Sequence, residues 1–487
     1  MSVSIVQYFG EQNSKCGYCT GTNCSRSHGM HAYRLACDDY QELIDRGWRR
    51  CGNYCYKPQN NVTCCPCYTI KSDALEFKLS KSNKRILRRM NKFLRDGKRE
   101  PGESTTPQNG DGDDIGNGVN ISELQPQLPD KKPSVIDVEH VENLAQSRGE
   151  QLKTAKNLEP LESKTGDGDH SASSQAANKC KLTNSNPPRK KAKQMRLERR
   201  QAKLGIPLEQ AQTKTMTQEK SLRDFLSAAS ETDKHKLKIV LVAASDIQRS
   251  CTDAVHALYR KYQIVIHNDN PARLTLSSMQ RFLVESPLKH EKKEDAPEMG
   301  YGSFHQQYWL DDKLIAVGVI DILPGSVSSV YFFYDPDYSF LSLGTYGSLR
   351  EIDLVQTIAE RVPALKYYYM GFYIHSCPKM RYKGKLSASY LLCPETYVWL
   401  PLTDDIRSKL DAQKYQRLNP VVTDKDVNEF LNQHLDDVQL LLDARTCITY
   451  QRFIRMAGAF GERESIIEYC KLVGKVCAHR MVYVNMS

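Results

Sequence analysis

The sequence predicts an α+β protein with a small cysteine-rich N-terminal module, a long linker and a larger C-terminal body. Nine of the 16 cysteines lie within the first 67 residues. No aromatic residue occurs in the 131 residues from 94 to 224. A segment that lacks these large apolar side chains and is rich in Gly, Pro, Ser and acids cannot build an ordinary core. Beyond Phe225, apolar residues recur with the periods of strands and helices in alternation.

These observations predict domain boundaries near residues 98 and 220. We expect a cysteine-rich domain with a basic helix over 1–98, a disordered linker over 99–220, and a body over 221–487 that ends in a helical extension. The linker closes on a basic block, because residues 179–204 contain 10 basic residues and 1 acidic residue. Residues 189–203 of this block could form a transient helix and are typical of nuclear-localisation or RNA-contacting patches, which also arise by chance.

The sequence shows no feature of a membrane or secreted protein. It has no run of about 20 apolar residues, and its first residues lack the basic and apolar regions of a signal peptide. We therefore expect a protein of the cytoplasm or the nucleus. In such reducing compartments, clustered cysteines indicate metal or redox chemistry rather than disulfides.

A candidate metal site combines Cys16 and Cys19 with the segment Cys64-Cys65-Pro66-Cys67. Two cysteines separated by two residues can ligate one metal because the intervening turn aims both sulfurs inward, and a second pair completes a tetrahedral site. Adjacent cysteines chelate one ion less readily, and other donors lie nearby: Cys24, Cys51, Cys55, Cys67, His28 and His31. The alternative to a functional site is a zinc site that only stabilises the small module. Thiols alone do not distinguish zinc from an iron–sulfur cluster.

A strand from Thr69 to Phe77 and an amphipathic helix from Ser80 to Arg95 are expected after the cysteines. The basic side of this helix includes Arg88 and Arg89. Such a face either contacts nucleic acid or is merely solvated, and the pattern favours neither.

The body is predicted to mix strands and helices. Strands are expected at 237–243, 263–267, 304–310, 314–323, 327–334 and 366–374, and helices at 247–262, after Ser342, and along the apolar stripes 427–442 and 466–476. The order hairpin, strand, glycine-containing turn, helix, strand is similar to that of the GNAT acyltransferase core. In that architecture two central strands diverge, and the helix start presents free N–H groups to a ligand. The order alone does not single out this fold.

A second constellation is the aromatic strand from Tyr367 that runs into Lys379, Arg381 and Lys383. If the chain stays extended, these three cations share one face. Aromatic residues such as Tyr373 interleaved with cations suit stacking on unpaired bases and contact with phosphates. The alternative is a core strand with a solvated basic end.

Four blocks, in order along the chain, resemble the eukaryotic arginyl-tRNA–protein transferase family. They are Cys16-Gly-Tyr-Cys19 with Cys64-Cys65-Pro66, the segment Gln307 to Pro324, the segment Tyr331 to Pro336 with Ser342 to Tyr346, and the segment Tyr368 to Lys383. The similarity covers residues 1 to about 95 and 225 to about 420. The elements at 334–336 and 342–346 also resemble those of bacterial leucyl-tRNA–protein transferases.

The resemblance implies transfer of arginine from arginyl-tRNA to the α-amino group of proteins that begin with Asp, Glu or oxidised Cys, which marks them for degradation by the N-degron pathway. It implies no need for ATP or CoA, because the aminoacyl ester already stores the energy. An α-amine has a pKa of about 7.7 to 8.0, so a strong base is unnecessary near pH 7. Catalysis should then depend on positioning and on stabilisation of the oxyanion. A monomer is expected.

The resemblance also implies roles for residues. Cys16, Cys19, Cys64 and Cys65 would hold an iron–sulfur cluster, with zinc or haem as alternatives. Candidates for the acyl-transfer centre are Tyr334, Asp335 and the turn with Ser342, Gly344 and Thr345, although Asp335-Pro336 also suits a plain turn or helix cap. Candidates for the acidic N-terminus or the tRNA are Lys379, Arg381, Lys383, Tyr373, Arg88 and Arg89.

Two other functions remain as alternatives. One is a GNAT acyltransferase that uses acyl-CoA, but the two glycines of Ser342 to Gly347 do not have the spacing of the usual pyrophosphate loop. The other is a non-catalytic cysteine-rich RNA-binding protein, which the basic blocks would suit.

Overall fold

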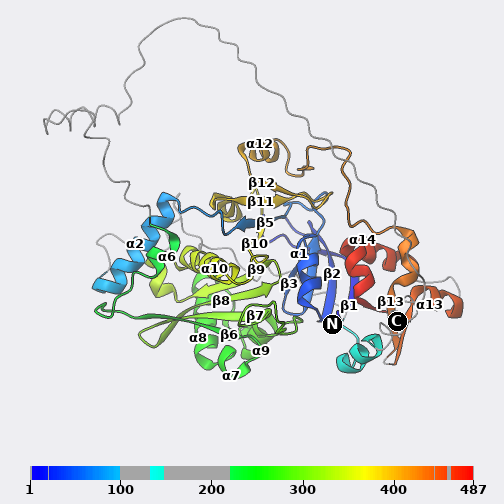
Figure 1. Ribbon diagram of the computed structural model, residues 1–487, viewed down its shortest axis with the longest axis horizontal. Coiled ribbons are helices and arrows are strands. Elements are labelled where there is room, and N and C mark those ends of the chain that lie inside the picture. The colour runs from blue at the N-terminus through cyan, green and yellow to red at the C-terminus, as the bar shows by residue number, and fades with distance from the viewer. Residues whose placement is uncertain are drawn as a thin grey trace, which may run out of the picture. The chain divides into compact units, whose positions relative to one another are not determined.

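The computed structural model describes residues 3–19, 21–98, 132–146, 220–443, 445–457 and 462–485, and these contain two β-sheets (Figure 1). The predicted basic helix at 189–203 and most of the predicted linker lie outside the described residues. Within the described part of the chain, no helix is both long and apolar enough to cross a lipid bilayer.

The first sheet joins the two ends of the described chain. Its strand order is β14-β13-β15-β1-β2-β4-β3. β1 pairs antiparallel with β2 and parallel with β15, so a strand near the C-terminus lies beside the first strand. The strands are β1 (Ile5–Ser14), β2 (Ser25–Arg34), β3 (Arg49–Cys51), β4 (Tyr54–Pro58), β13 (Gln439–Asp443), β14 (Thr446–Thr449) and β15 (Val482–Val484).

The second sheet has the order β12-β11-β5-β10-β9-β8-β7-β6. β5 comes from the N-terminal segment, yet it lies between β10 and β11 of the body. Residues 1–151 and 221–487 accordingly form one compact unit. The strands are β5 (Tyr68–Asp73), β6 (Leu237–Ala243), β7 (Gly302–Leu310), β8 (Lys313–Leu323), β9 (Ser326–Tyr334), β10 (Tyr367–Tyr373), β11 (Ser389–Leu392) and β12 (Trp399–Pro401).

Two long helices lie against opposite faces of this second sheet. Helix α8 (Asp253–His267) packs its Tyr259 ring 5.7 Å from Phe333 of β9. Helix α10 (Leu343–Ala359) packs against the neighbouring residue Phe332. The Phe332 ring lies so close to Gly347 of the helix that no larger residue would fit at position 347. Since successive strand residues point to opposite faces, the two helices cover the two sides of β9.

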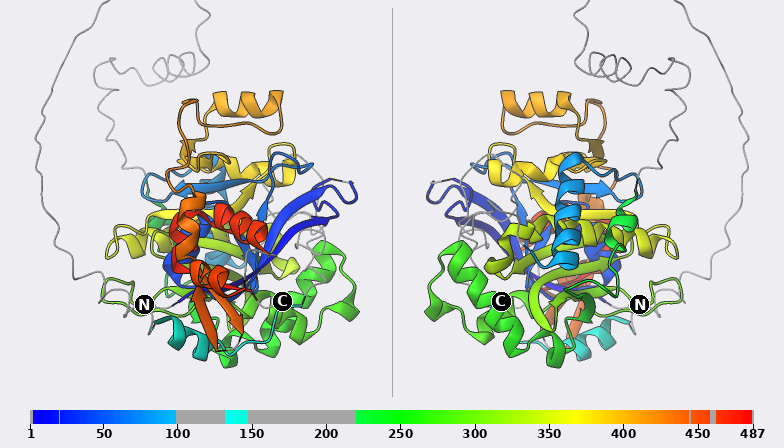
Figure 2. Two further views of the ribbon diagram at one scale, coloured as in Figure 1. Left: turned by 90° about the vertical axis from the view of Figure 1, so that its right-hand side faces the viewer. Right: turned by 90° about the vertical axis from the view of Figure 1, so that its left-hand side faces the viewer.

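The longest helix of the described residues, α14 (Arg463–Arg480), packs against central strands of the first sheet, where its Tyr469 ring lies 5.9 Å from Tyr8 of β1 and 4.9 Å from Tyr483 of β15. The other helices lie around the two sheets (Figures 1 and 2). α2 (Lys81–Asp96) begins at the Ser80 cap, ends at Gly97 in the left-handed region, and contacts α10. The others are α1 (Cys37–Ile44), α6 (Leu222–Leu226), α7 (Ile247–Ser250), α9 (Leu276–Met279), α11 (Pro378–Arg381), α12 (Asp404–Ala412), α13 (Tyr450–Ala457), the 3-10 turns η1 (Pro271–Arg273), η3 (Pro336–Leu341), η4 (Tyr382–Lys385) and η5 (Asn432–Asp437), and the π turn η2 (Gln280–Val284).

Three predictions of local structure are wrong. Residues 263–267 are the last turn of α8, because its buried face continues through Tyr262 and Gln263, and tertiary packing overrides the β-branched residues. The stripe 427–442 is not a helix but contains η5 and β13, and Val427 is fully exposed. Residues 132–146 are ordered rather than disordered: Val141 is fully buried and packs with Ile5 and Val482, so aliphatic side chains replace the missing aromatics.

A buried ion pair holds the N-terminal segment to the body. Arg50 of β3 donates to both carboxylate oxygens of Asp321 in β8, at 2.8 and 2.5 Å. The two side chains are 3% and 0% exposed. Ser303 of β7 completes the network with a hydrogen bond to Asp321 of 2.7 Å. The two sheets are therefore connected through a fully satisfied polar core.

Candidate metal centre and acyl-transfer site

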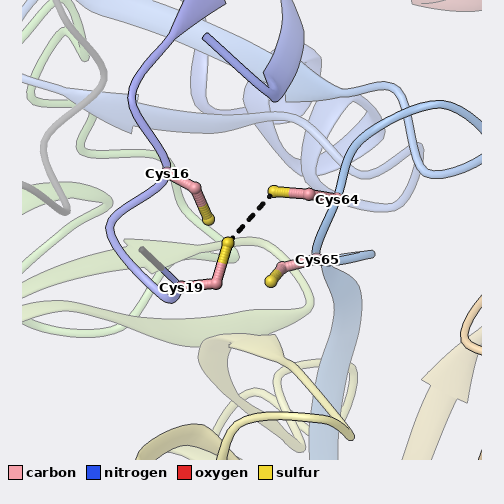
Figure 3. A group of neighbouring side chains, drawn as sticks. All are labelled: Cys16, Cys19, Cys64 and Cys65. Atoms are coloured by element: carbon pink, nitrogen blue, oxygen red, sulfur yellow. Dashed lines mark hydrogen bonds between the residues drawn. The ribbon is translucent and has the colours of Figure 1, made fainter. Parts of the chain in front are cut away.

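The structure brings the four predicted cysteines together. The sulfur atoms of Cys16, Cys19, Cys64 and Cys65 all lie within 4.8 Å of one another, and Figure 3 shows them pointing toward a common centre. The first pair follows β1, and the second pair precedes β5. Backbone hydrogen bonds from Cys16 to Gly21 and from Cys64 to Cys24 fix the two loops that carry them.

This donor set fits a metal. A tetrahedral ion with metal–sulfur bonds of about 2.3 Å places its sulfurs about 3.8 Å apart, and the Cys19 and Cys64 sulfurs are separated by 3.6 Å. The Tyr18 backbone N–H donates to the Cys16 sulfur at 3.3 Å. A hydrogen bond from the Gly21 backbone lowers the pKa of the Cys19 thiol to about 7. Burial instead raises the pKa values of the Cys64 and Cys65 thiols. The backbone N–H thus favours a thiolate at Cys19, and a bound cation would favour thiolates at the others.

The other potential donors are arranged differently. Cys24 lies 3.2 Å from the Cys64 sulfur but outside the group of four. The Cys67 thiol donates to the Cys65 carbonyl. Both ring nitrogens of His28 are engaged, one with Tyr8 and one with Gln59. None of these three residues belongs to the group of four.

The cysteine site packs directly against the end of β10. Cys16, Cys65 and Cys67 form one buried cluster with Phe372, Ile374 and Cys377. This packing connects the predicted metal module with the start of the predicted aromatic and basic segment.

The start of α10 provides a second site. Ser342 adopts a left-handed conformation (φ 52°), so the chain turns sharply from η3 into the helix. The first N–H groups of a helix have no partner within the helix. The Thr345 side chain is 8% exposed, and among the described residues no group bonds to its hydroxyl. Free donors and an unpaired hydroxyl at one helix start suit a carbonyl or anionic ligand.

Arg89 ties the N-terminal segment to this helix start. Its guanidinium donates to the Phe340 carbonyl at 2.6 Å and to the Ser342 hydroxyl at 3.5 Å. Arg88, by contrast, lies over the Phe225 ring at 5.7 Å. Both arginines were predicted to contact the substrate or the tRNA. Arg89 contacts the predicted acyl-transfer turn, whereas Arg88 contacts Phe225.

Asp335 and Tyr334 occupy the end of β9. Burial would raise the pKa of Asp335, but hydrogen bonds from Lys261 (2.5 Å) and Lys313 (2.8 Å) outweigh it and hold this pKa below its usual range. Asp335 also accepts from the Asp337 N–H and caps η3. Tyr334 is buried with its ring 5.0 Å from Tyr262. Asp335 is thus an ionised anchor for the turn that leads to Ser342.

The three cations expected on one extended face do not share it. Pro378 starts α11, so the chain turns helical there and continues into η4. Lys379 is exposed, Arg381 pairs with Asp411 at 3.1 Å, and Lys383 turns inward to donate to the Phe372 carbonyl at 3.1 Å.

A hydrogen-bonded chain at the end of β10 was not predicted from the sequence. The buried Tyr373 hydroxyl lies 2.6 Å from Nδ1 of His375, whose Nε2 lies 2.7 Å from Asp411. Arg381 also contacts both His375 and Asp411. The sequence feature that could have indicated this chain is a histidine two residues after the strand residue Tyr373. The partner of His375, Asp411, comes from α12, and no sequence pattern marks it.

Glu351 lies fully buried in α10 and accepts a 2.5 Å hydrogen bond from Tyr368 of β10. Burial raises the pKa of Glu351 to about 7. An acid with a higher pKa in the folded state stabilises the fold below its unfolded pKa of about 4.3, and this contribution is lost as pH rises through the folded pKa.

Glu351→Gln removes this titration. Between pH 4.5 and 7.5 we expect the unfolding free energy of the unaltered protein to fall by about 2–4 kcal/mol relative to the variant. Urea unfolding at the two pH values measures the difference, with the exposed Glu298→Gln as the control. Equal pH dependence of the Glu351→Gln variant and the unaltered protein would contradict the prediction.

Comparison with known proteins agrees with the two-part organisation of the sequence. The family model described as arginine-tRNA-protein transferase, N terminus, matches residues 14–85, and the model for the C terminus of the same family matches residues 254–393. The first range contains the four cysteines, and the second contains the start of α10 and the hydrogen-bonded chain from Tyr373 to His375.

Similar proteins carry the same description. Arginyl-tRNA–protein transferase 1 of Drosophila melanogaster is 63% identical over 100% of this chain and 100% of its own length. Arginyl-tRNA–protein transferase 2 of Arabidopsis thaliana is 34% identical over 86% of this chain and 78% of its own. An aspartate/glutamate leucyltransferase of Campylobacter jejuni is 35% identical over 19% of this chain and 37% of its own.

One similar solved structure is a C-terminal domain from Agrobacterium fabrum described as part of a lysylphosphatidylglycerol synthetase. It shares 11% identity over 28% of this chain and 37% of that chain, and its TM-score of 0.16 carries no argument about the fold. The sequence comparisons are decisive, because two family models match in order and one relative is 63% identical over the full length. The chain belongs to the arginyl-tRNA–protein transferase family.

Proposed function

We propose that this chain transfers arginine from arginyl-tRNA to the α-amino group of proteins that begin with Asp, Glu or oxidised Cys, and so marks them for degradation by the N-degron pathway. The observation that carries the proposal is the full-length similarity to a protein named arginyl-tRNA–protein transferase. The donor is an ester, so neither ATP nor CoA is part of the proposed reaction.

We also propose a GNAT-like core around β9, α10 and β10. Support comes from the pairing of β9 with β10, which is parallel and limited to the residues from Tyr367 to Tyr369 opposite Ser326 to Ser328. Beyond that point β10 pairs on its other side with β5, up to Tyr373. Helix α10, which connects the two strands, starts beyond the C-terminal end of β9, where β9 no longer pairs with β10. Diverging parallel strands with a helix start beside them are the arrangement expected for this core.

The proposed chemistry is attack of the substrate α-amine on the arginyl ester carbonyl. The C–N bond forms, the ester C–O bond breaks, the ribose hydroxyl of the terminal adenosine leaves, and the amine proton goes to that oxygen through solvent. N–H groups at the start of α10 and the Thr345 hydroxyl would stabilise the oxyanion. Arg89 and the lysine-bound Asp335 would position the turn that carries these donors.

Thr345→Val keeps the shape of the side chain but removes the unpaired hydroxyl. We expect kcat to fall about 10- to 100-fold with little change in KM for arginyl-tRNA, because an oxyanion donor acts mainly in the transition state. Steady-state transfer assays measure this, with Thr357→Val at the other end of α10 as the matched control. An unchanged kcat would remove Thr345 from the proposed site.

We propose that the four cysteines hold an iron–sulfur cluster or a single zinc ion. The compact spacing of the sulfurs supports one tetrahedral ion, whereas a cluster would require the sulfurs to move apart to admit it. Bound metal would fix the loops beside β10. Metal analysis and visible absorption of protein purified without oxygen distinguish the two, since zinc is colourless and iron–sulfur clusters absorb visible light.

The decisive experiment combines labelled arginyl-tRNA with peptides that differ only in the first residue. We expect label on peptides that begin with Asp or Glu, and none on a matched peptide that begins with Asn or has an acetylated N-terminus. Transfer from acetyl-CoA instead would favour a GNAT acyltransferase. Binding of tRNA without any transfer would favour a non-catalytic RNA-binding protein.

A further inference from the structure

A pocket of about 290 Å³ beside the start of β5 has no role in the chemistry proposed above. Its walls come from parts of the chain that are far apart in sequence: β4, the loop 59–61, the loop that carries Tyr397, and α14. The side chains of Lys57, Arg46 and His28 line it together with the rings of Tyr397 and Tyr415.

Lys57 brings a buried positive charge into this pocket. Its side chain is only 9% exposed, and its ammonium donates to the Tyr397 hydroxyl at 2.8 Å and to the Leu472 carbonyl at 3.3 Å. Burial lowers the pKa of Lys57. In the described part of the chain, no carboxylate lies within ion-pair distance of this ammonium. Burial of an ammonium without a carboxylate partner is costly, and an anion bound beside Lys57 would offset that cost.

The other two basic residues of the pocket are already accounted for. Arg46 forms a bidentate ion pair with Asp426, at 3.1 and 2.7 Å. Burial lowers the pKa of His28, which keeps the imidazole neutral near pH 7. Of the two cations that line the pocket, Arg46 has a carboxylate partner, and Lys57 has none within ion-pair distance in the described part of the chain.

Tyr397, whose hydroxyl accepts the hydrogen bond from Lys57, has an unusual backbone conformation. Its φ of 56° lies in the left-handed region, which bulky residues rarely adopt outside functional sites. The ring lies 4.5 Å from the Lys57 ammonium and 4.0 Å from the Arg46 guanidinium. These two cations also lower the pKa of Tyr397 against the effect of burial, which alone would raise it.

The pocket lies close to the end of β10. Cys67 and Thr69 of the β5 region line it, Thr69 pairs with Phe372 of β10, and neighbouring strands are about 4.8 Å apart. Asn60 in the pocket wall holds the Cys67 backbone through two hydrogen bonds, of 3.1 and 2.8 Å. The pocket is thus built onto β5, the strand that pairs with β10 of the proposed GNAT-like core.

We propose that this pocket binds the side-chain carboxylate of the Asp or Glu at the N-terminus of the protein substrate, with Lys57 as its charge partner and Tyr397 orienting Lys57. This inference rests on the proposed function. One buried charge suits one carboxylate, whereas an RNA backbone is bound by several cations along an open groove.

The test compares Lys57→Met with the unaltered full-length chain on peptides that begin with Asp. We expect KM for the peptide to rise about 10- to 100-fold, as for loss of a charge-assisted hydrogen bond, while KM for arginyl-tRNA stays unchanged. Lys57→Arg should recover part of the loss. Lys238→Met, at an exposed lysine of β6, is the matched control and should change neither value.

Peptide binding without tRNA separates this inference from the proposed function. Asp-starting and Asn-starting peptides are titrated into each variant, and we expect Lys57→Met to erase the preference for Asp. Tyr397→Phe, which keeps the ring, should reduce that preference about 3- to 10-fold and serves if Lys57→Met does not fold. A preserved preference for Asp, or a loss of tRNA binding in its place, would overturn the inference.

Discussion

Cys64→Ala is expected to lower the metal affinity of the N-terminal module by more than about 100-fold and to destabilise it. Structural zinc sites contribute about 10–16 kcal/mol of apparent binding energy, and each of four ligands carries a large share. Cys64 is central because its sulfur lies 3.6 Å from that of Cys19 and 3.2 Å from that of Cys24. Metal content and thermal unfolding of protein purified without oxygen measure the two effects.

Cys16→Ala should behave in the same way, since its sulfur belongs to the same group of four. Cys251→Ala is the control, because this partly exposed cysteine lies outside the group. If Cys16→Ala and Cys64→Ala keep the metal content and visible absorption of the unaltered protein, the assigned ligands are wrong.

Arg50→Ala is expected to lower the free energy of unfolding by about 3–5 kcal/mol, because it leaves the buried Asp321 carboxylate without its partner. Both side chains are at most 3% exposed. The pair connects β3 of the first sheet with β8 of the second. Urea unfolding at pH 7 measures the loss.

The double variant Arg50→Met with Asp321→Leu separates the pair from its surroundings. Replacing both charges by apolar side chains of similar size should recover most of the stability, since it removes the buried charge itself. A loss below about 1 kcal/mol in Arg50→Ala would show that the pair does not hold the two sheets together.

Much of the local structure could be predicted from the sequence. The hairpin of β7 and β8, strands β6, β9 and β10, and helix α2 are within a few residues of their predicted positions, because their apolar periods are strong. Spacing predicted a metal site with Cys16 and Cys19 but left its other ligands open. The family resemblance implied Cys64 and Cys65, and the structure groups these four cysteines.

The pairing of strands that are far apart in the sequence was decided only by the tertiary structure. β5 leaves the cysteine module to pair between β10 and β11, and β15 pairs with β1, so the segments 1–98 and 221–487 share one core. Strand pairing over hundreds of residues depends on the whole fold rather than on local period. For the same reason the stripe 427–442 became η5 and β13.

The candidate sites divide in the same way. The sequence by itself determined the family, the cysteine ligands to test and the turn from Ser342 into a helix, because short motifs in the sequence mark each of them. Only the tertiary structure brought Asp411 to His375, the two lysines to Asp335, and Tyr397 to Lys57. Each of these contacts joins residues at least 22 positions apart, and whether such groups meet depends on packing that no local pattern specifies.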